Sequence, residues 1–93
     1  MPAPTPIVTV AAYAVNCLPD NHPLAAQFRL HVRRYRGSWV IEHQGEFLTL
    51  NQELALEPEL FDTAEHALAL ATAYAPTMRF HGRQPADILQ DEK

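Results

Sequence analysis

Residues 28–36 alternate between apolar and polar side chains, and this alternation constrains the fold more than any other feature of the chain. One side of the repeat is apolar: Phe28, Leu30 and Val32. The other side is polar or basic: Arg29, His31, Arg33 and Tyr35. A period of two is typical of a strand with one buried and one exposed face. The chain is therefore expected to build a sheet whose apolar side covers a core and whose arginines face outward.

Three more short runs follow this segment, and residues that favour turns separate them. Gly37 is expected to form the turn of the first hairpin, and Gln44-Gly45 the turn of the second, because glycine adopts the positive φ that tight hairpins need. The predicted strands are 28–36, 38–43, 46–50 and 53–57, the last ended by Pro58. Residues 77–80 predict a further short strand, and residues 7–15 fit either a strand or a short helix.

An apolar stripe at helical spacing comes after the strands and predicts one main helix. Its members are Ala64, Ala67, Leu68, Ala71, Tyr74 and Ala75. Asp62 or Thr63 is a natural N-cap, and Glu65 stands three residues after Asp62, as in a capping box. Pro76 ends the helix, and residues 85–89 predict a single helical turn. The predicted fold class is α+β, an antiparallel four- to five-stranded meander packed on one face by a single main α-helix.

The chain length and composition are those of one globular unit. At 93 residues there is room for a single core, so we expect residues 1–93 to form one domain, with 1–6 and 90–93 frayed. No apolar run approaches the roughly 20 residues that cross a bilayer. Residues 1–6 carry no Lys or Arg, unlike the start of a secretory signal. We therefore expect a cytoplasmic protein that does not contact a membrane.

Charge is strongly segregated along the chain, although the net charge is only −4. Four of the seven basic residues fall in one eight-residue window that contains no acid: Arg29, Arg33, Arg34 and Arg36. Residues 42–65 contain no Lys or Arg and seven acids: Glu42, Glu46, Glu53, Glu57, Glu59, Asp62 and Glu65. This segregation predicts an electrically lopsided molecule, which bears on its partners more than on its fold.

Patterns for catalysis, metal binding and cofactor binding are missing from the sequence. The five histidines have no ligand spacing, although His31 and His43 are expected near each other across the first hairpin. Cys17 is the only cysteine, which excludes an internal disulfide, and we expect it to be a buried, inert thiol. Ser38 lacks the glycine frame of a nucleophile turn. We expect no catalytic residue, no metal and no cofactor, and a protein that is not an enzyme.

The arginine-bearing strand is the sharpest functional feature. Arginines and aromatic residues on an exposed sheet face dock on nucleic-acid phosphates or on acidic protein surfaces. We expect the partner-binding residues to be Arg29, Arg33, Arg34, Tyr35, Arg36, Trp39, Glu42 and Glu46. The alternative without a partner is a solvated strand face whose charge is balanced by acids elsewhere in the molecule.

Two stretches together resemble the plant ethylene-response-factor type of DNA-binding domain. They are Tyr-Arg-Gly-Ser-Trp at residues 35–39 and Phe-Asp-Thr-Ala-Glu-His-Ala at residues 61–67. The resemblance implies a three-stranded sheet with one helix, and DNA reading by arginines and tryptophan of the sheet. The corresponding residues here are Arg33, Arg34, Arg36 and Trp39.

Residues 22–88 look like a loose group of uncharacterised small proteins of actinobacteria and their phages. The similarity rests on a tryptophan after a strand and on short patterns at 45–48, 57–58, 67–71, 75–76 and 82. These patterns read Gly-Glu-Phe-Leu, Glu-Pro, Ala-Leu-Ala-Leu-Ala, Ala-Pro and a late Gly. The resemblance implies the fold and a mobile-element or accessory setting, without an activity.

We therefore expect a small non-enzymatic module that binds a macromolecule. Its favoured form is a phage or mobile-element accessory protein that acts stoichiometrically on a host protein, for example as an inhibitor of a defence nuclease or CRISPR complex. One alternative is a duplex DNA-binding protein that uses the arginine-bearing sheet face. Another is a structural homo-oligomer, such as a homodimer, that uses an exposed sheet edge.

Overall fold

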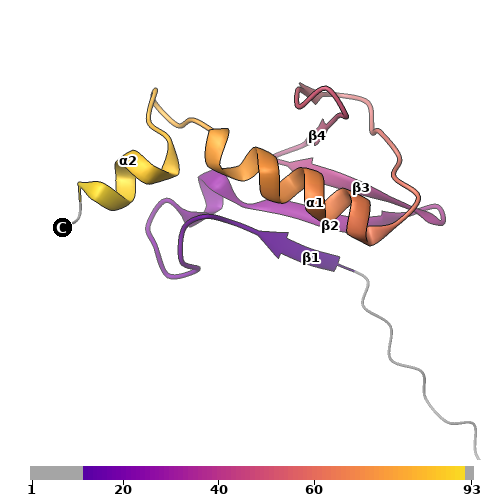
Figure 1. The fold of residues 1–93 in the computed structure, drawn as a ribbon, viewed down its shortest axis with the longest axis horizontal. Coiled ribbons are helices and arrows are strands. Elements are labelled where there is room, and N and C mark those ends of the chain that lie inside the picture. The colour runs from indigo at the N-terminus through magenta and orange to yellow at the C-terminus, as the bar shows by residue number, and fades with distance from the viewer. Residues whose placement is uncertain (1–11, 92–93) are drawn as a thin grey trace, which may run out of the picture.

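Tight turns fold the middle of the chain into an antiparallel meander, and one helix packs along it (Figure 1). The computed structural model describes residues 12–91. Five strands lie in the sheet in the order in which they occur in the chain. They are β1 (Ala12–Val15), β2 (Leu30–Tyr35), β3 (Ser38–His43), β4 (Glu46–Leu48) and β5 (Leu54–Ala55). The predicted α+β class, a meander with one main helix, is confirmed.

The two predicted glycine turns close hairpins. The turn between β2 and β3 consists of Arg36 and Gly37, with φ of 51° and 83°. The turn between β3 and β4 consists of Gln44 and Gly45, with φ of 49° and 88°. Positive φ at both central residues is the mark of the type I′ turn, whose twist matches that of the flanking strands. Glycine takes the second position without steric cost, and this is why the chain reverses there.

The main helix, α1 (Ala64–Tyr74), begins at one of the two predicted caps. The Oγ1 atom of Thr63 accepts a hydrogen bond from the backbone N–H of His66, at 3.1 Å. The predicted capping box between Asp62 and Glu65 is therefore wrong. With Thr63 as the cap, the position that a box would fill is held by His66. The helix ends before Pro76, and a short 3-10 helix, η2 (Ala75–Thr77), continues from it.

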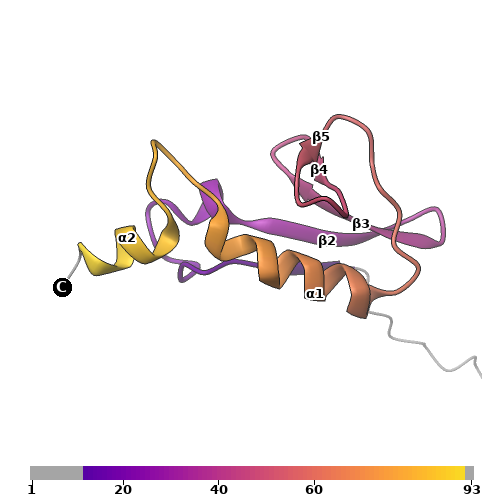
Figure 2. The ribbon, with the colours of Figure 1, turned by 45° about the horizontal axis from the view of Figure 1, so that its top comes forward.

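The core lies between α1 and the sheet. Figure 2 shows α1 running along the sheet, with the β4–β5 hairpin lying away from the helix. Ala67 and Ala71 are fully buried, and their small side chains let the helix backbone approach the strands closely. Larger side chains fill the space between the layers: Phe28, Leu30, Val32, Trp39, Ile41, Leu48 and Phe61. Small side chains on the helix thus allow the close approach, and larger ones fill the remaining volume.

Strand register divides the sheet into two faces. Tyr13, Val32 and Ile41 form one row across the first three strands and belong to the core under α1. The next row, Ala12, Arg33 and Val40, points the opposite way because successive side chains in a strand alternate. We call this opposite side the outer face. It carries the polar half of the alternation from which the strand at residues 28–36 was predicted.

Three predicted strands differ from the structure at their ends. Phe28 is buried as expected but belongs to a 3-10 helix, η1 (Ala25–Phe28), so β2 begins only at Leu30. The strands predicted at 46–50 and 53–57 are shorter, because a turn with a hydrogen bond from Gln52 N–H to the Thr49 carbonyl separates them. The segment 7–15 is a strand from Ala12 on, and its residues 7–11 lie outside the described part of the chain.

The short strand predicted at residues 77–80 is wrong. Thr77 ends η2, in which the ring of Pro76 holds a helical φ, and the N–H of Met78 donates to the Ala75 carbonyl. Phe80 makes only an isolated bridge to Arg83. The fifth strand of the sheet is instead β1, at the other end of the chain.

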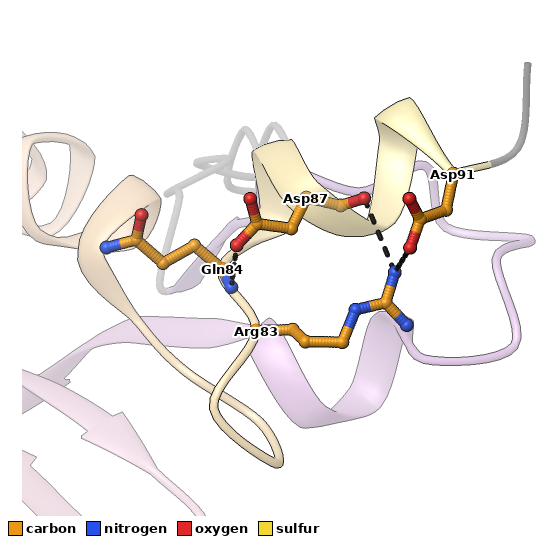
Figure 3. Close-up of polar contacts among 4 residues, drawn as sticks. All are labelled: Arg83, Gln84, Asp87 and Asp91. Atoms are coloured by element: carbon orange, nitrogen blue, oxygen red, sulfur yellow. Dashed lines mark hydrogen bonds and ion pairs between the residues drawn. The ribbon is translucent and has the colours of Figure 1, made fainter.

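A second short helix, α2 (Pro85–Gln90), forms where a helical turn was predicted. Figure 3 shows its first turn, where the Gln84 backbone N–H donates to Oδ2 of Asp87 at 3.0 Å. Arg83 forms an ion pair with Asp91 and donates to the Asp87 carbonyl at 3.3 Å (Figure 3). Gln90 ends α2 and Asp91 is its C-cap, within the segment 90–93 that was expected to fray. Residues 1–6 and 92–93 lie outside the described residues.

The close helix–sheet contact predicts that enlarging either buried alanine will destabilise the fold. We expect Ala67→Leu and Ala71→Leu each to lower the free energy of unfolding by about 1–3 kcal/mol, because the extra methylene groups overpack the contact. Ala69→Leu is the matched control, since Ala69 is exposed on the same helix and leucine is almost as good a helix former as alanine. Urea unfolding measures all three; equal stability of Ala67→Leu and Ala69→Leu would contradict the packing.

Candidate functional site

The β2–β3 hairpin brings most of the predicted binding residues to one end of the sheet. Tyr35 and Ser38 pair at its last rung, and the Arg36–Gly37 turn closes it. Arg33, Arg34 and Trp39 lie one or two rungs inward. We call these residues the hairpin tip: Arg33, Arg34, Tyr35, Arg36 and Trp39. The tip is rigidly placed, because the tight turn and the strand ladder leave the backbone little freedom.

The arginines of the hairpin tip divide between the two faces of the sheet. Arg33 is on the outer face, in the row of Ala12 and Val40. Arg34 directly opposes Trp39 and shares the face covered by α1. Arg36 sits in the turn itself, beyond the last rung. The expected basic surface is therefore not one flat sheet face. It is a set of guanidinium groups arranged around the end of a hairpin.

Trp39 is part of the core, and its expected place on an exposed surface is wrong. Its side chain is only 8% exposed, because strand parity turns it toward α1. The ring lies 5.8 Å from the ring of Tyr13, and the Trp39 backbone exchanges two hydrogen bonds of 2.8 Å with Phe61. The guanidinium of Arg34 lies 5.7 Å from the Trp39 ring centroid. The Trp39 ring thus packs under the Arg34 guanidinium, and little of the Trp39 side chain is exposed to a partner.

Tyr35 has a similar role on the outer face. Its ring lies 5.9 Å from the guanidinium of Arg33 and 5.3 Å from that of Arg36. Each such contact between a guanidinium and an aromatic ring contributes about 0.5–1 kcal/mol at an exposed site. Two arginines therefore lie against one half-buried tyrosine. Tyr35 orients the charges at the tip as well as offering its own surface.

The charge of Arg33 is already balanced within the molecule. Its Nε donates to Oε1 of Glu42 at 3.1 Å, across β2 and β3. Both side chains are about one-third exposed, at 37% and 29%, so the pair is neither buried nor fully solvated. The segregation of basic and acidic residues along the chain is thus partly cancelled in space. Glu42 acts here as a partner of Arg33.

Arg29 and Glu46 lie apart from the hairpin tip. Arg29 precedes β2 at the opposite end, where its guanidinium is 4.0 Å from a carboxylate oxygen of Asp20. Glu46 begins β4 beyond the other turn, paired with His43. Glu46 opposes His43, which points to the same face as Ile41, so Glu46 lies on the helix side of the sheet. Burial, and after it the Glu46 carboxylate, raise the pKa of Tyr74 on α1. These two predicted residues do not join the others.

Arg34 and Arg36 remain without an acidic partner among residues 12–91. Both are exposed, and their described contacts are with the rings of Trp39 and Tyr35. The ion pairs of the described chain engage Arg29, Arg33 and Arg83 instead. Of the three described arginines without an ion pair, two therefore lie at the tip, and the third is Arg79, which follows α1 and donates to the Gly82 carbonyl.

A second exposed feature was not predicted from the sequence. Leu50, Leu56 and Leu60 are 57%, 81% and 53% exposed, in the segment that comes after β4. Leu56 was expected to lie in a strand, but β5 ends at Ala55. The backbone N–H of Leu50 donates to a carboxylate oxygen of Glu59 at 2.8 Å, so the two ends of the segment touch. The hint in the sequence is that leucines alternate with glutamates and a proline over residues 50–60.

The side chains considered as metal ligands or reactive groups do not lie together in the described structure. In the described part of the chain, no three His, Cys, Asp or Glu side chains form a group able to hold a metal ion. His31 opposes Glu42, so His43 in the next position points to the other face, and the expected proximity of the two histidines is wrong. Cys17 is exposed rather than buried, although partial burial raises the pKa of its thiol. No pocket is found over the described residues.

Within residues 12–91, neither α1 nor any other helix has both the length and the apolar character that a bilayer span requires.

The Arg33–Glu42 pair predicts a measurable coupling. In a double-mutant cycle of Arg33→Ala and Glu42→Ala, we expect a coupling free energy of about 0.2–1 kcal/mol, as for other partly exposed pairs. The coupling should shrink as salt screens the charges. A cycle of Arg33→Ala with Glu46→Ala is the control and should show none, since Glu46 lies elsewhere. Denaturant unfolding gives all the values; a larger coupling in the control would show that the assigned pairing is wrong.

Comparisons with the models of protein families, with curated proteins and with solved structures find no match to this chain. The two resemblances described from sequence therefore stay predictions. The function of the chain is inferred instead from the geometry and charge of its described residues.

Proposed function

We propose that this chain is a non-enzymatic protein-binding module that docks through its hairpin tip on an acidic surface of a partner protein. The observation that carries the proposal is the pair Arg34 and Arg36. Within the described residues both lack an acidic partner, and each lies against an aromatic ring that orients it.

The physical basis is the residue type and its preparation for binding. Arg, Tyr and Trp are the residues most enriched among those that dominate binding energy at protein interfaces. Ordering a free arginine side chain on binding costs about 0.5–1.5 kcal/mol. Stacking on Tyr35 or Trp39 supplies part of that order beforehand. A partner with carboxylates at matching positions would then gain charge-assisted hydrogen bonds at a reduced entropic cost.

Duplex DNA is supported less well as the partner. Affinity for DNA grows with the number of phosphates that basic residues neutralise. Arg29 and Arg33 already contact acids of the same molecule, and the net charge of the whole chain is −4. Trp39, which the plant DNA-binding resemblance assigns to base reading, is in the core. Two unpaired arginines make few phosphate contacts.

The biological setting is part of the same proposal. We infer an accessory protein of a phage or mobile element that acts in the cytoplasm and binds a host protein stoichiometrically. Inhibition of a defence nuclease or CRISPR complex is one concrete form of it. This setting rests on the sequence resemblance over residues 22–88 and on the absence of catalytic patterns in the sequence.

Charge reversal at the hairpin tip tests the mode of binding. Immobilised wild-type protein and the variants Arg36→Glu and Arg79→Glu are exposed to extract of the native host, and retained proteins are quantified by mass spectrometry. Arg79 is exposed and far from the tip, so its reversal changes net charge equally. We expect a partner retained by wild type and Arg79→Glu to be lost with Arg36→Glu. With the purified partner, Arg36→Glu should weaken the Kd at least about 10-fold.

The DNA alternative gives a different set of results. A duplex probe in a gel shift would be bound at low salt, released steeply as salt rises, and not bound by the double variant Arg33→Ala/Arg34→Ala. That outcome, or a partner retained equally by Arg36→Glu and wild type, would contradict docking of a protein on the tip.

A further inference from the structure

The two edges of the sheet differ in how they are protected. A strand at an edge has unpaired backbone groups, and stable monomers usually protect it by shortness, charge or proline. β5 has all three protections: it is two residues long, Glu53 precedes it, and Glu57 and Pro58 come closely after it. β1 is described over four residues and lacks the other two protections, since Ala12–Val15 contains no charge and no proline.

β1 is also held firmly as an edge. All four of its residues pair with β2, from Ala12 opposite Arg33 to Val15 opposite Leu30. Tyr13 packs on Trp39 with ring centroids 5.8 Å apart, and Val15 packs against the core. Within residues 12–91, no strand pairs with the other side of β1. The structure therefore presents a short, rigid row of backbone donors and acceptors.

We propose that β1 pairs antiparallel with β1 of a second copy of this chain, about a twofold axis. An antiparallel pairing of a strand with itself is automatically symmetric, so each copy offers what the other needs. Directly opposed residues of an antiparallel pair point to the same face. If Ala14 faces Ala14 of the second copy, Tyr13 faces Val15, so the alanines share the outer face and the larger side chains share the helix face.

Charge favours this edge over the rest of the surface. Two copies of a chain with net charge −4 repel each other, and six of the seven acids of residues 42–65 lie in or beside β3–β5 and in the segment before α1, whereas Glu65 is in the first turn of α1. β1 is at the opposite edge of the sheet. Among the β2 residues that lie opposite β1, the arginine is Arg33, and its charge is already paired with Glu42. A charged peptide would find no complementary charge on β1, whereas a second β1 requires none.

The pairing joins two five-stranded sheets into one continuous sheet of ten strands. Both α1 helices then lie on the same side of it. The hairpin tip lies at the Ala12 end of β1, since Ala12 opposes Arg33. Antiparallel pairing therefore carries the two tips to opposite ends of the double sheet, and the dimer does not cover either of them. Dimerisation and partner binding are independent in this arrangement.

Molar mass in solution tests the proposal directly. Light scattering coupled to size exclusion, with sedimentation equilibrium up to about 1 mM protein, should show wild type approaching a mass of twice 10.5 kDa as concentration rises. Ala14→Lys places an ammonium group on each copy beside the twofold axis and should raise the dimer Kd at least about 10-fold. Ala69→Lys, an equal change on the exposed side of α1, should leave the Kd unchanged.

Two further measurements make the result decisive. Circular dichroism and thermal melting at low concentration establish that Ala14→Lys is folded, as its exposed position predicts. Arg36→Glu should dimerise like wild type, so a failure of partner binding and a failure of dimerisation are told apart. A wild-type protein that stays monomeric throughout the range would overturn the proposal. A wild-type dimer that Ala14→Lys does not weaken would overturn it as well.

Discussion

The contact between the alanine side of α1 and the large side chains of the sheet is the interaction on which the rest of the structure depends. Ala67 and Ala71 are fully buried, and their size sets how close the helix lies to β2 and β3. That closeness buries Trp39, whose backbone also bonds to Phe61 just before the helix. The end of the β2–β3 hairpin is thereby tied to the core. Its arginines lie against the rings of Trp39 and Tyr35, and this support underlies the binding role proposed for them.

The alternation of side chains along β2 then decides which group each arginine contacts. Adjacent residues on β2 point to opposite faces, so Arg33 meets Glu42 while Arg34 meets Trp39. One arginine is neutralised and the other keeps its charge, although they are neighbours in the chain. Arg36, in the turn, lies on Tyr35 and keeps its charge as well. The proposed binding surface is smaller than the basic segment of the sequence, and it lies at the tip of the hairpin rather than along one strand.

The same sheet offers a separate surface at its unprotected edge. β1 lacks charge and proline, whereas β5 is short and flanked by acids and a proline. Because sheet order follows chain order, β1 and the glutamates that flank β5 stand at opposite edges of the sheet. A twofold pairing through β1 therefore keeps the flanking glutamates of the two copies apart. The hairpin tips stay uncovered in such a dimer, so the two proposed contacts do not compete.

The sequence by itself determined the α+β class, the two glycine turns and the position of the main helix. These features depend on local chemistry: alternation in Phe28–Tyr35, positive φ at Gly37 and Gly45, and an N-cap at Asp62 or Thr63. Tertiary structure alone decided which charges remain free and which side chains are covered. The Arg33–Glu42 pair, the burial of Trp39 and the exposure of Leu56 all depend on register and strand length. A shift of one residue reverses every side chain in a strand, and only the packed sheet and helix settle that register.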